Sequence, residues 1–141
     1  MDMEELFGKP AFLIDIFPKT VPPKADGRYF EAERFFQRSR REIFGRFTAI
    51  LMKLYCYHDI ELVTEEGSRP ADARLLADLV DDCESGRLSY VHFFLPEEEV
   101  LITLFSGDLY MTVYNSQGAL SQLISQLAGS EGLFFYPAPA V

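Results

Sequence analysis

The sequence predicts a single α+β domain over residues 1–141, with a largely antiparallel sheet packed on one face by about three helices. Three observations predict this class. Residues 88–114 divide into three short segments whose side chains alternate between two faces, as in a β-meander. Apolar residues recur at helical spacing in three other segments. With 141 residues, 48% of them hydrophobic and 25% charged, the chain can bury a core without disulfides or metals.

The first segments predict a strand, a connector and a long helix. Residues 11–17 are mostly apolar and indicate a buried strand that ends at Pro18. Two further prolines make the stretch up to Gly27 a stiff surface connector. From about residue 30 to 54 the apolar residues fall on one side of a helix of roughly six turns.

Four arginines on this predicted helix divide between its two sides. Arg34, Arg38 and Arg41 lie opposite the apolar side, so we expect them to face water. Arg40 falls on the apolar side. We expect its methylene stem to be buried and its guanidinium to reach the surface.

The middle of the chain predicts a strand and a second helix. Residues 55–63 alternate enough to indicate the strand. Ser68 is expected to cap the following helix, with Pro70 in its first turn and Gly86 at its C-terminal end. The expected buried side of that helix consists of Leu75, Leu76, Leu79, Val80 and Cys83.

The last part of the chain predicts a third helix and one more extended segment. The helix follows Ser116, ends near Gly129 and has apolar residues at the spacing of one helix face. Residues 133–136 are apolar throughout, and prolines follow them. They indicate either a final buried strand or an extended segment that covers the core.

The meander allows a register to be predicted. Residues 96–99 join its first strand to its second, and residues 107–108 join the second to the third. These short links pair Leu95 with Val100 and Ser106 with Leu109. One face then collects nine apolar residues, which we expect to meet the helices: Val91, Phe93, Leu95, Val100, Ile102, Leu104, Leu109, Met111 and Val113.

The opposite face of the meander is the candidate binding surface. Large rings with polar tips surround a centre that carries hydroxyl groups, a composition that suits a protein interface or a shallow ligand site. Cover for this face can come from residues 133–141 or a helix, from a second copy, or from another protein or a small ligand. Beside Leu101, the face consists of the eight expected site residues Tyr90, His92, Phe94, Thr103, Phe105, Tyr110, Thr112 and Tyr114.

Charge and hydropathy limit the function classes. Residues 1–58 carry ten basic and eight acidic side chains, whereas residues 59–141 carry three basic and fourteen acidic ones. This balance argues against nucleic-acid binding, which requires Lys and Arg to neutralise phosphates. The sequence has no apolar run near the ~20 residues of a spanning helix, and its acidic start does not resemble a secretory signal. We therefore expect a cytoplasmic protein without a membrane partner, in which Cys56 and Cys83 are both buried thiols.

Several chemistries are considered and set aside. Cys56 and His58 share a predicted strand face, but such side chains point parallel and do not meet. His92 has no carboxylate in its predicted row, so a structural role is expected. The acidic runs at 97–99 and 78–82 fit solvated surfaces better than metal sites. We assign no catalytic residue, no metal ligand and no cofactor.

The sequence thus predicts a small cytoplasmic interaction protein without catalysis, possibly a homodimer through the aromatic sheet face. One alternative is a small-molecule-binding protein or enzyme with a pocket over His92, Thr103, Thr112 and Tyr110. Another is an acidic inhibitory or immunity-type protein whose C-terminal half meets a basic partner, with Asp78, Asp81 and Asp82 as one candidate contact.

Overall fold

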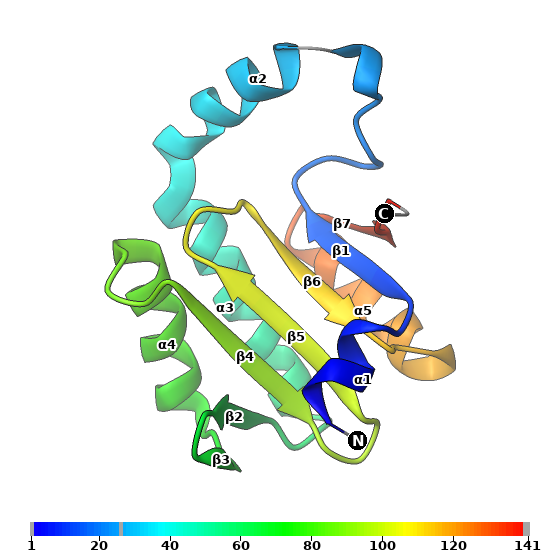
Figure 1. Cartoon of the computed structure of the whole chain (residues 1–141). Helices are drawn as coiled ribbons and strands as arrows, with labels where there is room; N and C mark the ends of the chain where they lie inside the picture. The colour runs from blue at the N-terminus through cyan, green and yellow to red at the C-terminus, as the bar shows by residue number, and fades with distance from the viewer. Residues whose placement is uncertain (1, 26, 140–141) are drawn as a thin grey trace.

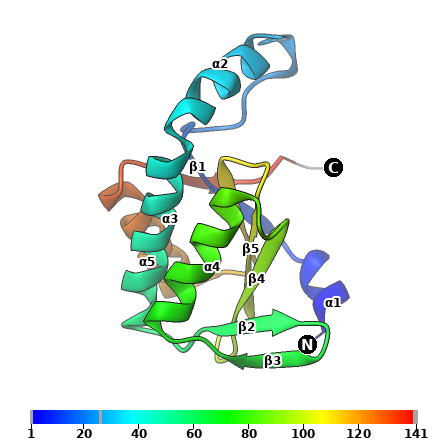
Figure 2. The ribbon, with the colours of Figure 1, turned by 90° about the vertical axis from the view of Figure 1, so that its left-hand side faces the viewer.

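A computed structural model describes residues 2–25 and 27–139 of the chain. These residues form an α+β domain built on a seven-stranded antiparallel sheet in the order β3-β2-β4-β5-β6-β1-β7. Three helices, α3, α4 and α5, lie on one face of the sheet, and the short helix α1 lies on the other (Figures 1 and 2). The predicted fold class is confirmed.

The elements follow one another from α1 to β7. The helices are α1 (Met3–Phe7), α2 (Arg28–Phe36), α3 (Arg40–Tyr55), α4 (Ala73–Ser85) and α5 (Gly118–Ser130), and 3-10 turns lie at Pro23–Ala25 and Gln37–Ser39. The strands are β1 (Ala11–Asp15), β2 (Glu61–Thr64), β3 (Gly67–Pro70), β4 (Tyr90–Leu95), β5 (Val100–Phe105), β6 (Tyr110–Tyr114) and β7 (Phe134–Pro137).

The meander has the predicted register. Leu95 pairs with Val100, and Thr103 pairs with both His92 and Thr112. All nine residues assigned to the apolar face are buried. They form the core together with α3, which packs against α4 and α5 and contributes Phe44 and Phe47 to it. Period-two alternation was sufficient here because both hairpin links are short, which leaves few ways to pair the strands.

The single long helix predicted over residues 30–54 is wrong. It is two helices, α2 and α3, separated by a 3-10 turn, which has fewer residues per turn than an α-helix and so interrupts a straight helix. Helix α2 extends beyond the end of the sheet (Figures 1 and 2). None of its residues is buried, and Phe30 and Phe35 are 66% and 58% exposed. The apolar spacing therefore corresponds to full burial only in α3, while Phe36 at the end of α2 is partly buried against the core.

The predicted exposure of three arginines is confirmed, but the guanidinium of Arg40 binds backbone oxygens of Cys83 and Glu84 where it was expected to reach water. Arg34, Arg38 and Arg41 are exposed. Arg40 is half-buried, and its guanidinium carbon lies 4.5 Å from the ring centroid of Phe44.

The predicted strand over residues 55–63 is also misplaced. Helix α3 continues through Tyr55, and only residues 61–64 form β2. The alternation upstream of residue 61 comes from the end of a helix and the turn after it. Cys56, expected to be buried, is exposed at the end of α3. Cys83 is buried in α4, and burial raises the pKa of its thiol to about 11.

The second helix starts later than predicted. Ser68 and Pro70 lie in β3, which pairs with β2 at the edge of the sheet, where proline is tolerated. Asp72 caps α4 instead, because its carboxylate accepts a hydrogen bond from the Leu75 amide at 2.9 Å. Gly86 ends the helix as predicted, with a left-handed backbone (φ 83°) that favours glycine.

The C-terminal segment completes the sheet. β7 pairs with β1 along its edge, so it extends the sheet rather than covering either of its faces. Leu133, just before β7, is buried, while Phe134 is 45% exposed. Within residues 2–25 and 27–139, no helix combines the length and the apolar character needed to cross a bilayer.

Candidate binding site

The aromatic face of the meander is covered only in its centre. Helix α1, which the sequence analysis did not predict, lies over the middle strands (Figure 1). Leu6 of α1 is 1% exposed, and Leu101 and Thr103 on the sheet are 0% and 1% exposed. Leu6 and Leu101 are buried but lie outside the main core cluster, so the burial around α1 is separate from the core beneath α3, α4 and α5.

Phe7, at the end of α1, divides the remaining aromatic face into two regions. Its ring makes edge contacts with His92 on one side and Tyr114 on the other, with centroid distances of 5.9 and 5.2 Å. Beyond His92 lie Tyr90 and Phe105, which are 48% and 42% exposed. We call Tyr90, His92 and Phe105 the exposed patch. Beyond Tyr114 lies a hollow.

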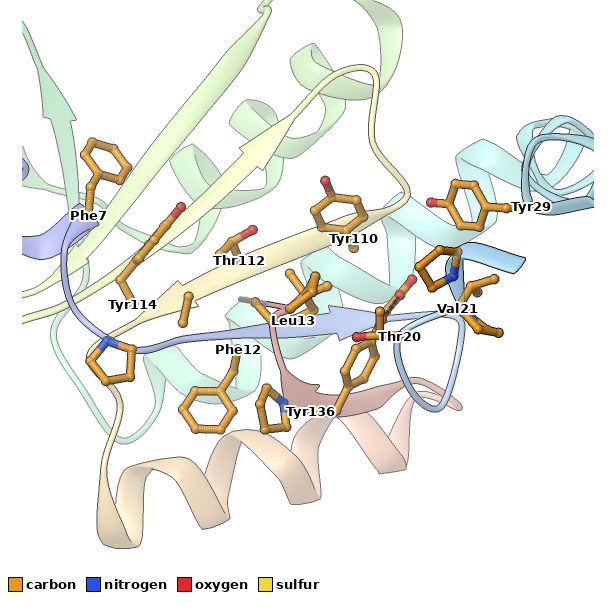
Figure 3. A pocket seen from close by; sticks show the side chains of 18 of the residues that line it. Phe7, Phe12, Leu13, Thr20, Val21, Tyr29, Tyr110, Thr112, Tyr114 and Tyr136 are labelled. Carbon is orange, nitrogen blue, oxygen red and sulfur yellow. Dashed lines mark hydrogen bonds between the residues drawn. The ribbon is translucent and has the colours of Figure 1, made fainter. Parts of the chain in front are cut away.

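This hollow is an open groove of about 910 Å³ over strands β6, β1 and β7 (Figure 3). Side chains of the three strands form its floor, including Thr112, Leu13 and Tyr136. Phe7 lies at one end, and the connector around residues 20–23 lies at the other with Tyr29 of α2. The sequence of β1 alternates its side chains, so Ala11, Leu13 and Asp15 share the groove face, while Ile14 points to the core and is fully buried.

Asp15 is the buried charged residue of the groove. It is 7% exposed and lines the groove at the end of β1. The Tyr136 hydroxyl of β7 donates a hydrogen bond to its Oδ2 atom, and the Ile16 amide donates to Oδ1 at 2.7 Å. Burial raises the pKa of the Asp15 carboxyl, and these hydrogen bonds oppose the shift.

The raised pKa of Asp15 has a consequence for stability. Because the folded chain holds this proton more tightly than the unfolded chain, the stabilising contribution is complete below the unfolded-state pKa of 3.8. It is lost as the pH rises through the folded-state pKa. Above that pKa the ionised Asp15 costs the fold stability, as charged groups at functional sites often do.

Two further tyrosines lie at the Asp15 end. The Tyr29 hydroxyl donates to a carboxylate oxygen of Glu33 at 3.3 Å. Burial, then the negative charges of Glu33 and Asp15, raise the pKa of Tyr29. Burial, then the negative charge of Asp108, raises the pKa of Tyr110 to about 12. Both phenols therefore stay protonated at neutral pH and present hydroxyl groups beside aromatic rings.

The eight residues predicted for the site do not stay together. Tyr110, Thr112 and Tyr114 line the groove, whereas Tyr90, His92 and Phe105 form the exposed patch on the far side of Phe7. Thr103 is buried, and Phe94 is half-buried. Burial lowers the pKa of His92, so its imidazole is neutral at pH 7. The pocket predicted over His92, Thr103, Thr112 and Tyr110 is therefore displaced toward β1 and β7.

Sequence reasoning missed most of the groove, including Phe7, Asp15, Tyr29 and Tyr136. One signal was present: Asp15 is the only charged residue within the apolar stretch 11–17. A charge in a buried strand is uncommon unless it is paired or functional. Tyr29 and Tyr136 carried no such signal, because they reach the groove only through the tertiary arrangement.

The residues of the other candidate catalytic and metal sites do not come together in the structure. Cys56 lies at the exposed end of α3 and donates to the backbone oxygen of Met52, four residues earlier. Asp82 forms an ion pair with Arg87 at 2.9 Å. Asp78 and Asp81 are both exposed to solvent. In the part of the chain that the structure describes, no three His, Cys, Asp or Glu side chains gather closely enough to hold a metal ion.

Comparisons with protein-family models, curated proteins and solved structures found no match for this chain. The function must therefore be argued from the groove itself. Its tyrosine hydroxyls and the Asp15 carboxylate can fix the orientation of a ligand, and its rings can bury the ligand's apolar body.

Proposed function

We propose that this chain is a small non-catalytic binding protein whose ligand lies in the groove over β6, β1 and β7. The observation that carries the proposal is the groove itself. Its volume of about 910 Å³ lies within the range of about 300–1,000 Å³ common for small-molecule sites. Its lining combines aromatic bodies with a few polar groups at one end, which is the usual composition of such sites.

Filling the groove should abolish binding. Thr112 lies on the floor between Tyr110 and Tyr114 (Figure 3), so a Thr112→Trp side chain would occupy the centre of the groove. We expect small aromatic compounds to shift the amide signals of β1 and β6 in an NMR titration of the parent. Thr112→Trp should weaken that binding at least tenfold.

The matched control is Tyr90→Trp, which alters the exposed patch outside the groove. It should bind like the parent. The proposal would be wrong if no compound shifted the groove signals, or if Thr112→Trp bound the same compounds as well as the parent does.

A second candidate function is self-association through the exposed patch. Tyr90 and Phe105 are paired across β4 and β5, and their rings lie 5.9 Å apart with about half of each residue exposed. Phe7, which is 44% exposed, extends this apolar surface. In a symmetric dimer the same patch of each copy would face the other, as expected for aromatic surfaces that soluble proteins keep covered.

Light scattering after size-exclusion chromatography tests this candidate. We expect the parent to reach a dimer's mass at high micromolar concentration, and Phe105→Glu to remain a monomer. Tyr57→Glu is the control, because Tyr57 is 67% exposed but lies away from the patch, after α3. A parent that stays monomeric throughout would contradict self-association and leave the groove proposal standing.

A cytoplasmic location is part of the same proposal. Both cysteines are free thiols, and one of them, Cys56, is exposed. Exposed free thiols persist in reducing compartments and tend to be oxidised outside them.

A further inference from the structure

Asp15 is a buried carboxylate at the groove, and no basic side chain of the described residues forms an ion pair with it. Among residues 2–25 and 27–139, the ion pairs join Arg46 to Glu42, Lys53 to Glu131 and Arg87 to Asp82. None of them reaches Asp15. A buried carboxylate normally pairs with a cation, because desolvation of the charge is otherwise poorly compensated. The Tyr136 hydroxyl and the Ile16 amide supply hydrogen bonds but no positive charge.

The surroundings of Asp15 favour a positive charge. Its negative charge and that of Glu33 act on both Tyr29 and Tyr110, so the two carboxylates lie on this side of the groove together. Asp108 adds a third carboxylate beside Tyr110. These carboxylates favour a cation at this end of the groove, whereas the neighbouring Lys19, Lys24 and Arg28 are exposed and do not line it.

The basic residue of the groove lies at its other end. Lys9 precedes β1 whereas Asp15 ends it, and six residues of extended chain span on the order of 20 Å at about 3.3 Å per residue. Charges so far apart are largely screened at physiological salt. Lys9 is exposed, so it does not offset the charge of Asp15.

We infer that the groove binds a small organic ammonium ion, with the ammonium group at Asp15 and the apolar body along Leu13 and Thr112 toward Tyr114. This inference rests on the proposed function and names its ligand class. The ammonium N–H groups would donate to the Asp15 carboxylate, and the rings of Tyr29, Tyr110 and Tyr136 would surround the charge. Tyrosine faces attract organic cations, and aromatic surroundings of this kind recognise ammonium groups in other proteins.

The burial of Asp15 is consistent with this role. Burial raises the pKa of its carboxyl, because desolvation disfavours the charged form. A nearby cation favours the charged form of a carboxyl, so a bound ammonium group would offset part of this desolvation.

Three probes that share one aromatic body separate charge from shape. They are 2-phenylethylammonium, neutral 2-phenylethanol and anionic 3-phenylpropanoate, each titrated into the full chain by calorimetry and by NMR. We expect the ammonium probe to bind at least tenfold more tightly than the other two, with the largest shifts in β1, β6 and β7. Equal affinities, or a preference for the neutral or anionic probe, would overturn the inference.

Asp15→Asn is the variant that isolates the carboxylate. Asparagine has nearly the same shape: its Oδ1 can accept from the Ile16 amide while its Nδ2 donates to the Tyr136 hydroxyl oxygen, so we expect a folded protein. Its affinities for the ammonium and alcohol probes should agree within about threefold. Glu97→Gln, which neutralises an exposed carboxylate between β4 and β5 outside the groove, should keep the preference of the parent.

The outcomes distinguish this inference from the proposed function. If all three probes shift the groove signals equally, the groove is a binding site and the ammonium assignment fails. If none of them shifts these signals, both fail. If Asp15→Asn does not fold, the comparison of the three probes on the parent still decides the question.

Discussion

Replacing Leu6 with alanine is expected to lower the free energy of unfolding by about 2–4 kcal/mol, the usual cost of truncating a fully buried leucine. Leu6 is 1% exposed although α1 has only five residues and lies outside the main core. So short a helix is not stable by itself. Its position therefore depends on this side chain and on the sheet surface beneath it.

The same substitution should also damage the groove. Phe7 follows Leu6 and forms one end of the groove, where it contacts Tyr114. If α1 detaches, that wall is lost and the buried Leu101 becomes accessible to water. Urea denaturation measures the loss of stability, and the probe titrations measure the loss of binding.

Glu4→Ala provides the control for Leu6→Ala, because Glu4 is exposed on the same helix. It should change the free energy of unfolding by no more than about 0.5 kcal/mol, as surface substitutions usually do. A similarly small effect of Leu6→Ala would show that α1 does not anchor on the sheet.

Replacing Arg40 with alanine is expected to cost about 2–3 kcal/mol, because hydrogen bonds to charged groups contribute about 1.5–3 kcal/mol and are not additive. Arg40 opens α3 and donates to the backbone oxygens of Cys83 and Glu84 at the C-terminal end of α4. It also donates to the Ser106 hydroxyl after β5 and stacks on Phe44. One guanidinium thus joins two helices and the sheet.

Two variants separate the contributions of charge and geometry at Arg40. Arg40→Lys keeps the positive charge but lacks the planar guanidinium group and its several N–H donors. We therefore expect it to recover less than half of the stability that Arg40→Ala loses. Arg41→Ala removes the neighbouring arginine, which is exposed, and should change stability by no more than about 0.5 kcal/mol. Equal effects of Arg40→Ala and Arg41→Ala in urea denaturation would contradict the contact network.

The strand faces and the register of the meander were predictable because they depend on residues close together in the sequence. Side chains in a strand alternate with a period of two, and short links limit the register. The rows that join His92, Thr103 and Thr112 therefore appear in the structure as predicted. The helices α4 and α5 were predictable for a similar reason, since one side of each is apolar and Gly86 ends the first.

The errors arose in segments whose residue spacing fits more than one secondary structure. The apolar residues before and after the turn at Gln37–Ser39 fit one helical spacing, although only α3 has a sheet to pack on. At residues 55–63 a helix end followed by a turn produced the alternation of a strand. Ser68 and Pro70 fit a helix start as well as an edge strand, and the pairing of β3 with β2 decided between them.

Only one strand of the candidate site was predictable. Tyr110, Thr112 and Tyr114 belong to one strand, so their common face followed from the sequence. The hydrogen bond between Tyr136 and Asp15 joins residues 121 positions apart and exists only because β1 lies between β6 and β7. No local pattern encodes that order of strands.

The sequence by itself determined the two faces of the meander and the aromatic character of one of them, because alternation in a strand depends only on neighbouring residues. Only the tertiary structure decided that α1 covers the centre of that face and that the groove lies beside it, over β6, β1 and β7. The physical reason is that both features depend on contacts between segments far apart in the chain. The burial of Asp15 among tyrosines is the product of those contacts.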